Sequence, residues 1–336
     1  MQKQNNLNPS MKKLLILLLL MAQATFAQQQ FYRIGDYRLE NGQILKDAKI
    51  GFRTFGKLNA NKSNAVLVPT WFTGTSQQKG FVANPDSFAD STKYFVIVVD
   101  ALGNGVSSSP SNSTAQKNQN FPLISIRDMV NTEYKLVREY LKINHLYAVT
   151  GISMGGMQSF QWMVSFPDFM DKVIPIIGSP KQSAYDKLFW NLQLNILERG
   201  QYSNESMKSV NALHQLNLWT PTYRAEHTPT DEYPAYLTKL EEDALKSNAY
   251  DWACQLRAMI NHDIFQGKAP EDVRKIIKAK VMVVVATQDH MVNPIAAIKL
   301  GQLLNAPIVE LTGDCGHMAT SCESAKMTAH IKGFLE

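Results

Sequence analysis

One short segment constrains the fold of this chain more than any other: Gly151-Ile152-Ser153-Met154-Gly155-Gly156. It directly follows an apolar run, 146–150, that is typical of a buried strand, and it opens a helical stretch, 156–166. A serine between strand and helix, with a glycine two positions away on each side, is the G-x-S-x-G pattern of a nucleophile elbow. The pattern predicts that the hydroxyl of Ser153 stands exposed at a sharp turn, because a Cβ at either flanking glycine would crowd that turn.

The rest of the chain alternates apolar runs with helical patterns, which predicts an α/β fold with a mostly parallel sheet covered by helices on both faces. The first two runs, separated by Glu40-Asn41-Gly42, favour a hairpin. The expected strands are 32–39, 48–55, 65–69, 94–99, 146–150, 172–177, 281–286 and 307–311. The expected helices of this core include 126–141 and 321–335.

Residues 181–270 interrupt this alternation, because they have helical patterns and contain no clear strand run. We interpret this segment as a helical cap inserted into the core and not as an independent domain. The core is then built from residues 28–180 and 271–336. A length of 336 residues suits one large α/β domain with such an insertion.

The elbow predicts partners downstream, because a serine hydroxyl is a poor nucleophile without a base. In folds with this elbow the acid precedes the histidine along the chain. His317 lies on a loop after the run 307–311, from which it can reach Ser153, and is the expected base. Asp289 directly follows the run 281–286 and is the expected acid. Asp314 is the alternative acid, although a turn role suits it better.

Two backbone amides are expected to stabilise negative charge on a substrate oxygen. One is the amide of Met154, at the N-terminus of the helix that follows the elbow. The other is the amide of Phe72, in the loop after the run 65–69. The side chains of Trp71 and Phe72 either line the substrate pocket or pack in the core, and the sequence leaves both open.

The sequence contains no pattern typical of a cofactor site or a metal site. The glycine-rich loop after Asp100 lacks the G-x-x-x-x-G-K-[ST] pattern of a phosphate site, and we interpret it as a tight turn at the rim of the active site. The pairs His262-Asp263 and Asp289-His290 lack zinc-like spacing, so structural roles are expected. The net charge of +5 comes without a cluster of lysines and arginines, which argues against nucleic-acid binding.

The N-terminus has the pattern of a secretory signal peptide. Counted from Met11, an alternative start to Met1, it has two lysines, an apolar run over 14–21 and small residues that end at Ala27. The apolar run is shorter than the ~20 residues that cross a bilayer. We expect residues 1–27 to be removed and the mature protein to be exported, into the periplasm or the medium, with no remaining membrane span.

Three cysteines, Cys254, Cys315 and Cys322, cannot all pair within one chain. Export permits disulfides. Cys315 and Cys322 lie seven residues apart around His317, and they can pair if a loop brings their Cα atoms within about 7 Å. Buried or partly buried, unpaired thiols are the simpler expectation.

Several segments together resemble the homoserine O-acetyltransferase family of the α/β hydrolases. They are Phe72-Thr73-Gly74, Phe121-Pro122-Leu123-Ile124-Ser125-Ile126-Arg127-Asp128-Met129-Val130, Gly151-Ile152-Ser153-Met154-Gly155-Gly156-Met157-Gln158 and, more faintly, Ala258-Met259 followed by His262-Asp263. The resemblance spans most of residues 45–335 and is weakest through the cap. It implies an α/β-hydrolase fold, an acyl-serine intermediate, a helical cap and commonly a homodimer.

The chain departs from that family where its members are thought to bind homoserine. Met318 directly follows His317, at a position where family members carry an aspartate for the amino group of homoserine. Tyr223-Arg224-Ala225 departs at its third position from the family's Tyr-Arg-Ser segment, whose arginine binds the carboxylate. The segment 105–110 also lacks the family's usual Gly-Ser-Thr-Gly-Pro form.

These features predict an exported serine hydrolase that cleaves a small-molecule carboxylic ester through an acyl-serine intermediate. Met318 in place of the aspartate, and export away from the acetyl-CoA of the cytoplasm, favour water as the acceptor. An O-acyltransferase such as homoserine O-acetyltransferase is the alternative. A binding protein without activity is a third hypothesis, which the complete set of Ser153, Asp289 and His317 disfavours.

Overall fold

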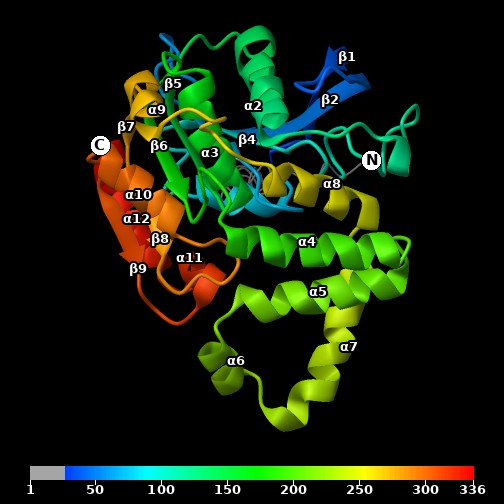
Figure 1. The fold of residues 1–336 in the computed structure, drawn as a ribbon. Helices are drawn as coiled ribbons and strands as arrows, with labels where there is room; N and C mark the ends of the chain where they lie inside the picture. Colours follow the sequence, from blue (N-terminus) through cyan, green and yellow to red (C-terminus); the bar gives the residue numbers. More distant parts are fainter. Residues whose placement is uncertain (1–26) are drawn as a thin grey trace, which may run out of the picture.

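A computed structural model describes residues 27–336, so the predicted signal peptide lies, except for Ala27, outside the described residues. The chain folds around a nine-stranded sheet with the order β1-β2-β4-β3-β5-β6-β8-β9, in which β7 also pairs with β6 (Figure 1). The strands are β1 (Gln30–Arg38), β2 (Ile44–Phe55), β3 (Ala65–Pro69), β4 (Phe95–Val99), β5 (Leu146–Ile152), β6 (Met170–Ile176), β7 (Lys280–Val281), β8 (Val283–Ala286) and β9 (Ile308–Leu311).

The sheet is antiparallel at one edge and parallel elsewhere. β1 and β2 form the expected hairpin, and β2 joins β4 in the antiparallel sense. Every other pairing, from β4 across to β9, is parallel. The expected α/β-hydrolase fold with a mostly parallel sheet is therefore confirmed. Because the strands are parallel, their carboxyl ends meet at one edge of the sheet, where loops from distant parts of the chain can converge.

Alternating strand residues build two cores, one on each face of the sheet. Leu67 of β3 belongs to the core that includes Met157 of α3, whereas its neighbours Val66 and Val68 belong to the core that includes Ile331 of α12. The helices and helical turns of this α/β core are η1 (Gln78–Ala83), η2 (Asn118–Asn120), α2 (Ile126–Lys135), η3 (Leu136–Tyr140), α3 (Met154–Ser165), α9 (Pro270–Ile276), α10 (Ile295–Leu303), η5 (Gly316–Met318), α11 (Ala319–Cys322) and α12 (Ser324–Leu335).

Two helices differ in extent from the prediction. The expected helix 126–141 begins at a capping box between Ser125 and Asp128, but it is α-helical only to Lys135 and continues as a π-helical turn. The expected helix 321–335 begins later, because Glu323 separates α11 from α12 and its side chain accepts a hydrogen bond from the amide of Gly313.

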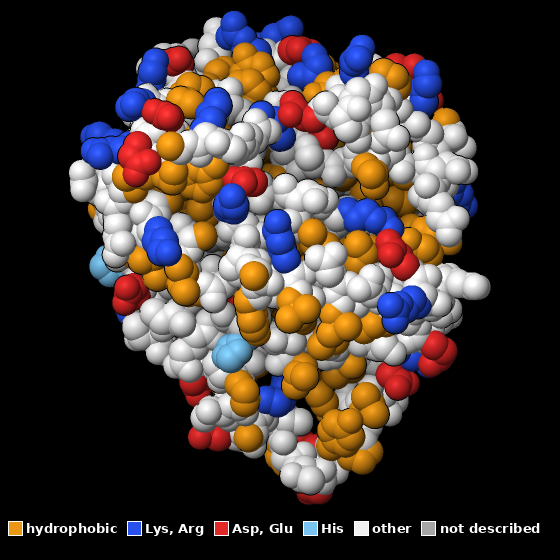
Figure 2. Space-filling view, viewed as in Figure 1, with side chains coloured by type: hydrophobic (Ala, Val, Ile, Leu, Met, Phe, Trp, Pro, Cys, Tyr) orange, Lys and Arg blue, Asp and Glu red, His pale blue; other side chains and the backbone are white. Residues whose placement is uncertain are grey.

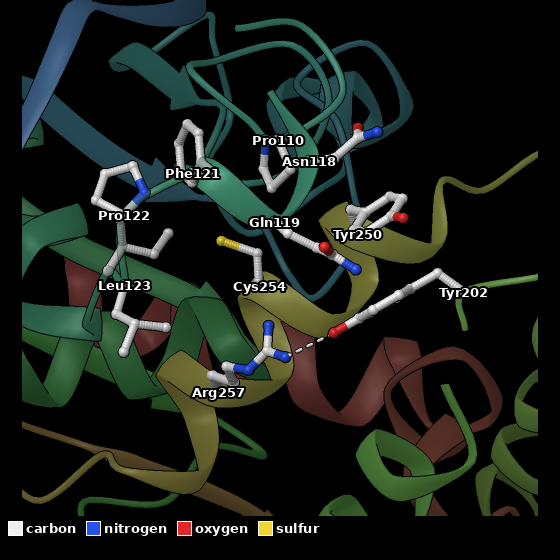
Figure 3. A pocket seen from close by; sticks show the side chains of 11 residues that line it. Pro110, Asn118, Gln119, Phe121, Pro122, Leu123, Tyr202, Tyr250, Cys254 and Arg257 are labelled. Atoms are coloured by element: carbon white, nitrogen blue, oxygen red, sulfur yellow. Dashed lines mark hydrogen bonds between the residues drawn. The ribbon is translucent and has the colours of Figure 1, made fainter. Parts of the chain in front are cut away.

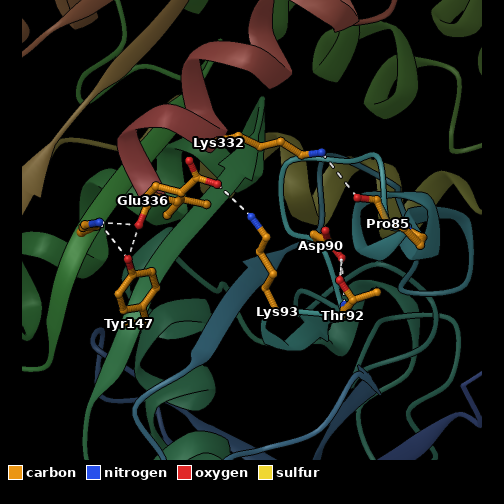
Figure 4. Close-up of polar contacts among 9 residues, drawn as sticks. Pro85, Asp90, Thr92, Lys93, Tyr147, Lys332 and Glu336 are labelled. Atoms are coloured by element: carbon orange, nitrogen blue, oxygen red, sulfur yellow. Dashed lines mark hydrogen bonds and ion pairs between the residues drawn. The ribbon is translucent and has the colours of Figure 1, made fainter.

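Polar contacts tie the end of α12 to the sheet, as Figure 4 shows. Lys93 pairs with Glu336 at 2.8 Å, and Lys332 donates to the carbonyl of Pro85 at 3.4 Å. Lys172 donates to the carbonyl of Leu335 at 2.6 Å. Exposed pairs of this kind contribute little stability. The burial of Ile331 and Leu335 therefore holds the helix in place.

A group of helices inserted between β6 and α9 lies beside the carboxyl ends of the strands (Figure 1). α4 begins at a capping box formed by Ser183 and Asp186. No helix in residues 27–336 is both long and apolar enough to span a membrane. The inserted helices are α4 (Ala184–Arg199), α5 (Asn204–Leu218), α6 (Pro221–His227), η4 (Thr230–Glu232), α7 (Tyr233–Ala244) and α8 (Ala249–Ile260).

Apolar side chains gather on the outer surface of these helices, in the lower part of Figure 2. Leu216 is 67% exposed and Tyr233 is 53% exposed, beside a hollow between α5, α6 and α7. Surfaces of this kind are typical of interfaces. The homodimer that the family resemblance implies stays a prediction.

The structure corrects the expectation of unpaired thiols at Cys315 and Cys322. The two form a disulfide with their Cα atoms 6.5 Å apart, and the third cysteine, Cys254, is free and buried. The turn η5 and the short helix α11 fold the chain back within those seven residues, which brings the two Cα atoms into bonding range. The disulfide thus closes a small loop that contains His317.

Candidate active site

Ser153 stands at the turn between β5 and α3 with φ +59° and ψ −119°, a conformation that an L-residue rarely adopts. Its amide donates to the carbonyl of Ile176 at 2.9 Å. A Cβ at Gly151 would come within 2.4 Å of the carbonyl oxygen of Gly155, and one at Gly155 within 2.6 Å of the carbonyl oxygen of Pro69. The two glycines are therefore required by close backbone contacts around the strained serine.

His317 and Asp289 form a chain of hydrogen bonds with this serine. The Nε2 atom of His317 lies 2.9 Å from the Oγ atom of Ser153, and its Nδ1 atom lies 2.7 Å from a carboxylate oxygen of Asp289. The other carboxylate oxygen accepts the amides of Met291 and Val292 at 2.8 and 2.9 Å. All three side chains are buried, so their hydrogen bonds are protected from competition with water.

Asp314, the alternative acid, does not take part in this chain. Its backbone carbonyl accepts a hydrogen bond from Thr220, which ties the loop of His317 to the start of α6. Asp289 reaches His317 because β8 and β9 are parallel neighbours, and the loops after them leave the same edge of the sheet. The geometry therefore joins Ser153 to His317 and Asp289, in the order expected from the sequence.

Phe72, in the loop after β3, lines the cavity over Ser153. Neither the Phe72 amide nor the Met154 amide donates a hydrogen bond to any group in the described part of the chain. The next residue, Thr73, has φ +58°, and its amide donates to the side chain of Gln255 at 2.8 Å. The same side chain donates to the carbonyl of Leu102 at 3.0 Å.

Asp100 supports this loop from behind. Its fully buried carboxylate accepts the amide of Ser76 at 2.7 Å, the hydroxyl of Ser76 at 2.7 Å and the side-chain amide of Asn104 at 3.0 Å. The glycine-rich turn that begins there was expected at the rim of the active site. The structure instead places this turn outside the cavity, because none of its residues lines the cavity over Ser153. Its role is to support the loop after β3 through Asp100.

The cavity over Ser153 has a volume of about 350 Å³ and is mainly apolar. Trp71, Phe72 and Met318, which the sequence singled out, all contribute to its wall. Arginine, lysine, aspartate and glutamate are absent from the lining in residues 27–336. The lining residues are Trp71, Phe72, Thr73, Phe81, Ile152, Ser153, Ile177, His214, Leu218, Met291, His317, Met318, Thr320 and Ser321.

Sequence reasoning missed the residues that the cap contributes, among them His214 and Leu218 of α5 and Gln255 of α8. Burial, and to a smaller extent the nearby His317, lower the pKa of His214 to about 3, so its imidazole is neutral. His214 and Leu218 are four residues apart, a spacing that places both side chains on the same face of a helix. This spacing was the signal available in the sequence. No pattern in the sequence linked that face to Ser153.

Arg224, the candidate for binding a carboxylate, lies away from this cavity. Its guanidinium sits 4.9 Å from the ring centre of Tyr236 and 5.9 Å from that of Trp219, and it lines the hollow between α5, α6 and α7. The pair His262-Asp263 is also absent from the cavity lining: His262 is buried and Asp263 pairs with Lys181 at 2.9 Å. No group of three or more possible metal ligands occurs in the described residues.

A second hollow lies between α8 and the segment that contains Pro110 and Phe121, as Figure 3 shows. The guanidinium of Arg257 there is already paired with Glu198 at 2.7 Å and with the hydroxyl of Tyr202 at 2.9 Å. Burial raises the pKa of the Cys254 thiol to about 12, so this cysteine is no nucleophile. The hollow therefore offers no chemistry comparable to that at Ser153.

Lys79 is a fully buried lysine behind the wall of the cavity over Ser153. Its ammonium group donates to the carbonyl of Pro69 at 2.9 Å and sits 4.9 Å from the ring centre of Trp71. Burial lowers the pKa of Lys79 to about 7. The buried Glu133, which accepts a hydrogen bond from Trp162 at 2.7 Å, has its pKa raised to about 8 by burial.

The sheet order, the strained serine and its hydrogen-bonded histidine and aspartate define an enzyme of the α/β-hydrolase superfamily. The model of a family described as the alpha/beta hydrolase fold matches residues 66–320. The chain belongs to this family.

Known members that resemble the chain include both esterases and acetyltransferases. A probable esterase of Corynebacterium glutamicum is 35% identical over 196 residues, and an ethyl acetate hydrolase of Pseudomonas veronii is 34% identical over 199 residues. These matches cover 55% and 57% of this chain, and they span only 56% and 57% of the relatives' own lengths. A homoserine O-acetyltransferase of Methanococcoides burtonii is 27% identical over an alignment of 354 residues, which covers 90% of this chain and 72% of that protein.

Solved structures show the same fold. An acetylester hydrolase from Corynebacterium glutamicum superimposes with a TM-score of 0.85 at 23% identity, over 92% of this chain and 96% of that one. A homoserine O-acetyltransferase from Bacillus anthracis gives a TM-score of 0.82 at 20% identity, over 92% and 98% of the two chains. The fold is thus common to enzymes with either name and does not choose between them.

Replacing Lys79 with methionine should remove a contribution to stability that grows as the pH rises. Between about pH 7 and 10.5 the unfolded lysine binds a proton that the folded one has released, so the wild type gains stability relative to the variant as the pH rises. We expect the wild type to gain on Lys79→Met by up to about 1.4 kcal/mol per pH unit in this range. Urea unfolding at pH 7, 8, 9 and 10 measures this.

Lys57→Met is the matched control, because Lys57 is exposed and its loss removes no buried charge. The same pH dependence in both variants would contradict the assignment of the effect to the buried amine of Lys79.

Proposed function

We propose that this protein is a serine hydrolase that cleaves small carboxylic esters through an acyl-serine intermediate. The observation that carries the proposal is the wall of the cavity over Ser153, in which His214 and His317 are the only ionisable side chains among the described residues. A neutral acyl ester suits such a wall. The ammonium and carboxylate groups of an amino acid would lose their hydration there without gaining charged partners. The similarity to esterases supports the same proposal.

In the first half-reaction the Oγ atom of Ser153 attacks the acyl carbonyl carbon, and Nε2 of His317, 2.9 Å away, takes the hydroxyl proton. Asp289 holds Nδ1 of His317 and stabilises the imidazolium that forms. The amides of Phe72 and Met154 donate hydrogen bonds to the oxyanion, a role for which both are free. The carbon–oxygen bond to the alcohol then breaks, and His317 gives the alcohol its proton.

In the second half-reaction a water molecule enters where the alcohol has left. His317 takes a proton from this water, and the hydroxide attacks the carbonyl of the acyl-serine. The bond from the acyl carbon to Oγ of Ser153 breaks, and His317 returns the proton to that oxygen. The products are a carboxylic acid and the free enzyme. In each half-reaction His317 acts first as a base and then as an acid.

Acyl transfer to homoserine is the second candidate, favoured by the long match to a homoserine O-acetyltransferase. Two features of the chain argue against it. Met318 lines the cavity at the position expected to hold the amino group, and Arg224 is engaged with Trp219 and Tyr236 outside that cavity. A substrate with both charges would therefore lack its two anchors.

We further propose that the protein is exported. The signal-peptide pattern of residues 1–27 supports this, as does the disulfide between Cys315 and Cys322, because such bonds persist in oxidising compartments and are rare in the cytosol. The described chain begins at Ala27, and Gln29 already bonds to the carboxylate of Asp100 at 3.0 Å. Cleavage after Ala27 would leave that contact intact.

The purified protein should hydrolyse p-nitrophenyl acetate and butyrate faster than the octanoate, because a cavity of about 350 Å³ has little room for a long acyl chain. It should form no O-acetylhomoserine from acetyl-CoA and homoserine. Faster transfer to homoserine than release of acetate would establish the acyltransferase instead.

Ser153→Ala should lower kcat for the acetate at least about 10³-fold, with an unchanged melting temperature.

Asp289→Asn should lower kcat about 10³-fold to 10⁴-fold, because the carboxylate no longer orients His317 or stabilises its positive charge. Asp314→Asn is the matched control and should keep kcat within about twofold, since only its backbone carbonyl has a defined partner. Steady-state kinetics with p-nitrophenyl acetate measure both. A greater loss for Asp314→Asn would move the acid to that residue.

Export is tested by expressing the full chain and separating periplasm, medium and cytoplasm. We expect the protein outside the cytoplasm, with intact mass and N-terminal sequence showing that it begins at Gln28 and carries one disulfide. An unprocessed chain retained in the cytoplasm would refute the proposal.

A further inference from the structure

His214 contributes a polar group from the cap to a cavity whose chemistry otherwise lies in the core. It sits on α5, whose last turn packs against the turn η5 that carries His317. Its ring lies 5.7 Å from that of Phe72 and 5.1 Å from that of Trp252, centre to centre, and it lines the cavity over Ser153. The imidazole thus packs against two aromatic rings that also contact each other, with their centres 4.8 Å apart, and it lines the substrate space.

The hydrogen-bonding capacity of this imidazole is unused within the described chain. Its Nδ1 atom is buried and has no hydrogen-bond partner among residues 27–336. Burial and the proximity of His317 hold the pKa of His214 at about 3, so the ring is neutral wherever His317 can act as a base. A neutral imidazole carries one N–H donor and one acceptor nitrogen. Because the Nδ1 atom is shielded from solvent, a ligand in the cavity can reach only the Nε2 edge of the ring, whose hydrogen-bonding capacity is also unused within the described chain.

The position of His214 indicates which part of an ester it meets. The alcohol oxygen must lie at Nε2 of His317 to receive its proton, so the alcohol part of the substrate starts beside η5. α5 covers this turn, with His214 and Leu218 of its inner face lining the same cavity. The cap therefore encloses the alcohol side of the ester, and His214 is the polar group that this helix supplies.

We propose that His214 binds an oxygen atom in the alcohol part of the ester, so that the enzyme prefers esters of short hydroxylated or ether-bearing alcohols over esters of plain alkyl alcohols. This inference rests on the proposed hydrolysis at Ser153. His214 is a specificity residue: it forms one hydrogen bond to the substrate and takes no proton. A neutral polar side chain in a mainly apolar wall discriminates in this way, because an alkyl alcohol leaves that side chain unpaired.

Two acetates of equal size test the proposal. 2-Hydroxyethyl acetate and propyl acetate share the acyl group and differ by a hydroxyl in place of a methyl group. We expect His214→Phe, which keeps a ring packed against Phe72 and Trp252, to lower the ratio of kcat/KM for the hydroxylated over the alkyl ester about fivefold to tenfold. Its kcat/KM for propyl acetate should stay within about twofold of the wild type. His214→Gln, which restores a polar side chain, should recover part of the ratio.

His227→Phe is the matched control, because His227 is an exposed cap histidine outside the cavity lining. It should leave the ratio unchanged. An unchanged ratio in His214→Phe, or an equal loss for both esters, overturns the assignment of His214 while hydrolysis at Ser153 stands. A wild type that cleaves neither ester nor p-nitrophenyl acetate overturns the proposed function itself.

Product inhibition of the wild type gives a test that needs no variant. Ethane-1,2-diol and propan-1-ol compete for the alcohol side of the cavity, and we expect the diol to inhibit about fivefold to tenfold more strongly. Equal inhibition, or stronger inhibition by propan-1-ol, would contradict a hydrogen bond from His214.

Discussion

The strained backbone of Ser153 is the constraint on which the rest of the site depends. A positive φ at a serine persists only where its surroundings hold it, and here the amide bonded to Ile176 and the close contacts at Gly151 and Gly155 do so. These contacts join β3, β5, β6 and the first turn of α3 within van der Waals distance. The packing around Ser153 therefore directs its hydroxyl toward the loops that follow the carboxyl ends of the strands.

Much of the site could be predicted because a parallel sheet converts position in sequence into position in space. Asp289 and His317 follow neighbouring parallel strands, so their loops must emerge at the edge where Ser153 stands. The parts that escaped prediction depend on how irregular segments fold. Cys315 pairs with Cys322 because η5 and α11 fold the chain back on itself. His214 reaches the cavity because α5 packs against η5.

The comparisons also separate the fold from the residues that decide the acceptor. Esterases and homoserine O-acetyltransferases have this fold with high structural similarity, so the sheet and the elbow are compatible with either acceptor. The distinction between water and an amino acid must come from what surrounds the acyl group. In this chain those surroundings are Met318, on the loop of the histidine, and an apolar wall to which α5 adds a single neutral polar side chain.

Gln255 gives the cap a second role. Its side chain joins the strained Thr73, next to the Phe72 amide, to the carbonyl of Leu102, and it sits on α8, the last helix of the inserted segment. α8 therefore belongs functionally with the α/β core, although it lies in the inserted segment. Recombination or grafting of α4 to α7 from a relative would alter the substrate space and keep Gln255, but the graft would have to supply equivalents of Asp186 and Thr220, which bind the amide of Asn293 and the carbonyl of Asp314 on the loops of Asp289 and His317. A crossover that also replaced α8 would remove the support of the oxyanion loop, so modular exchange of the cap has a natural limit before Ala249.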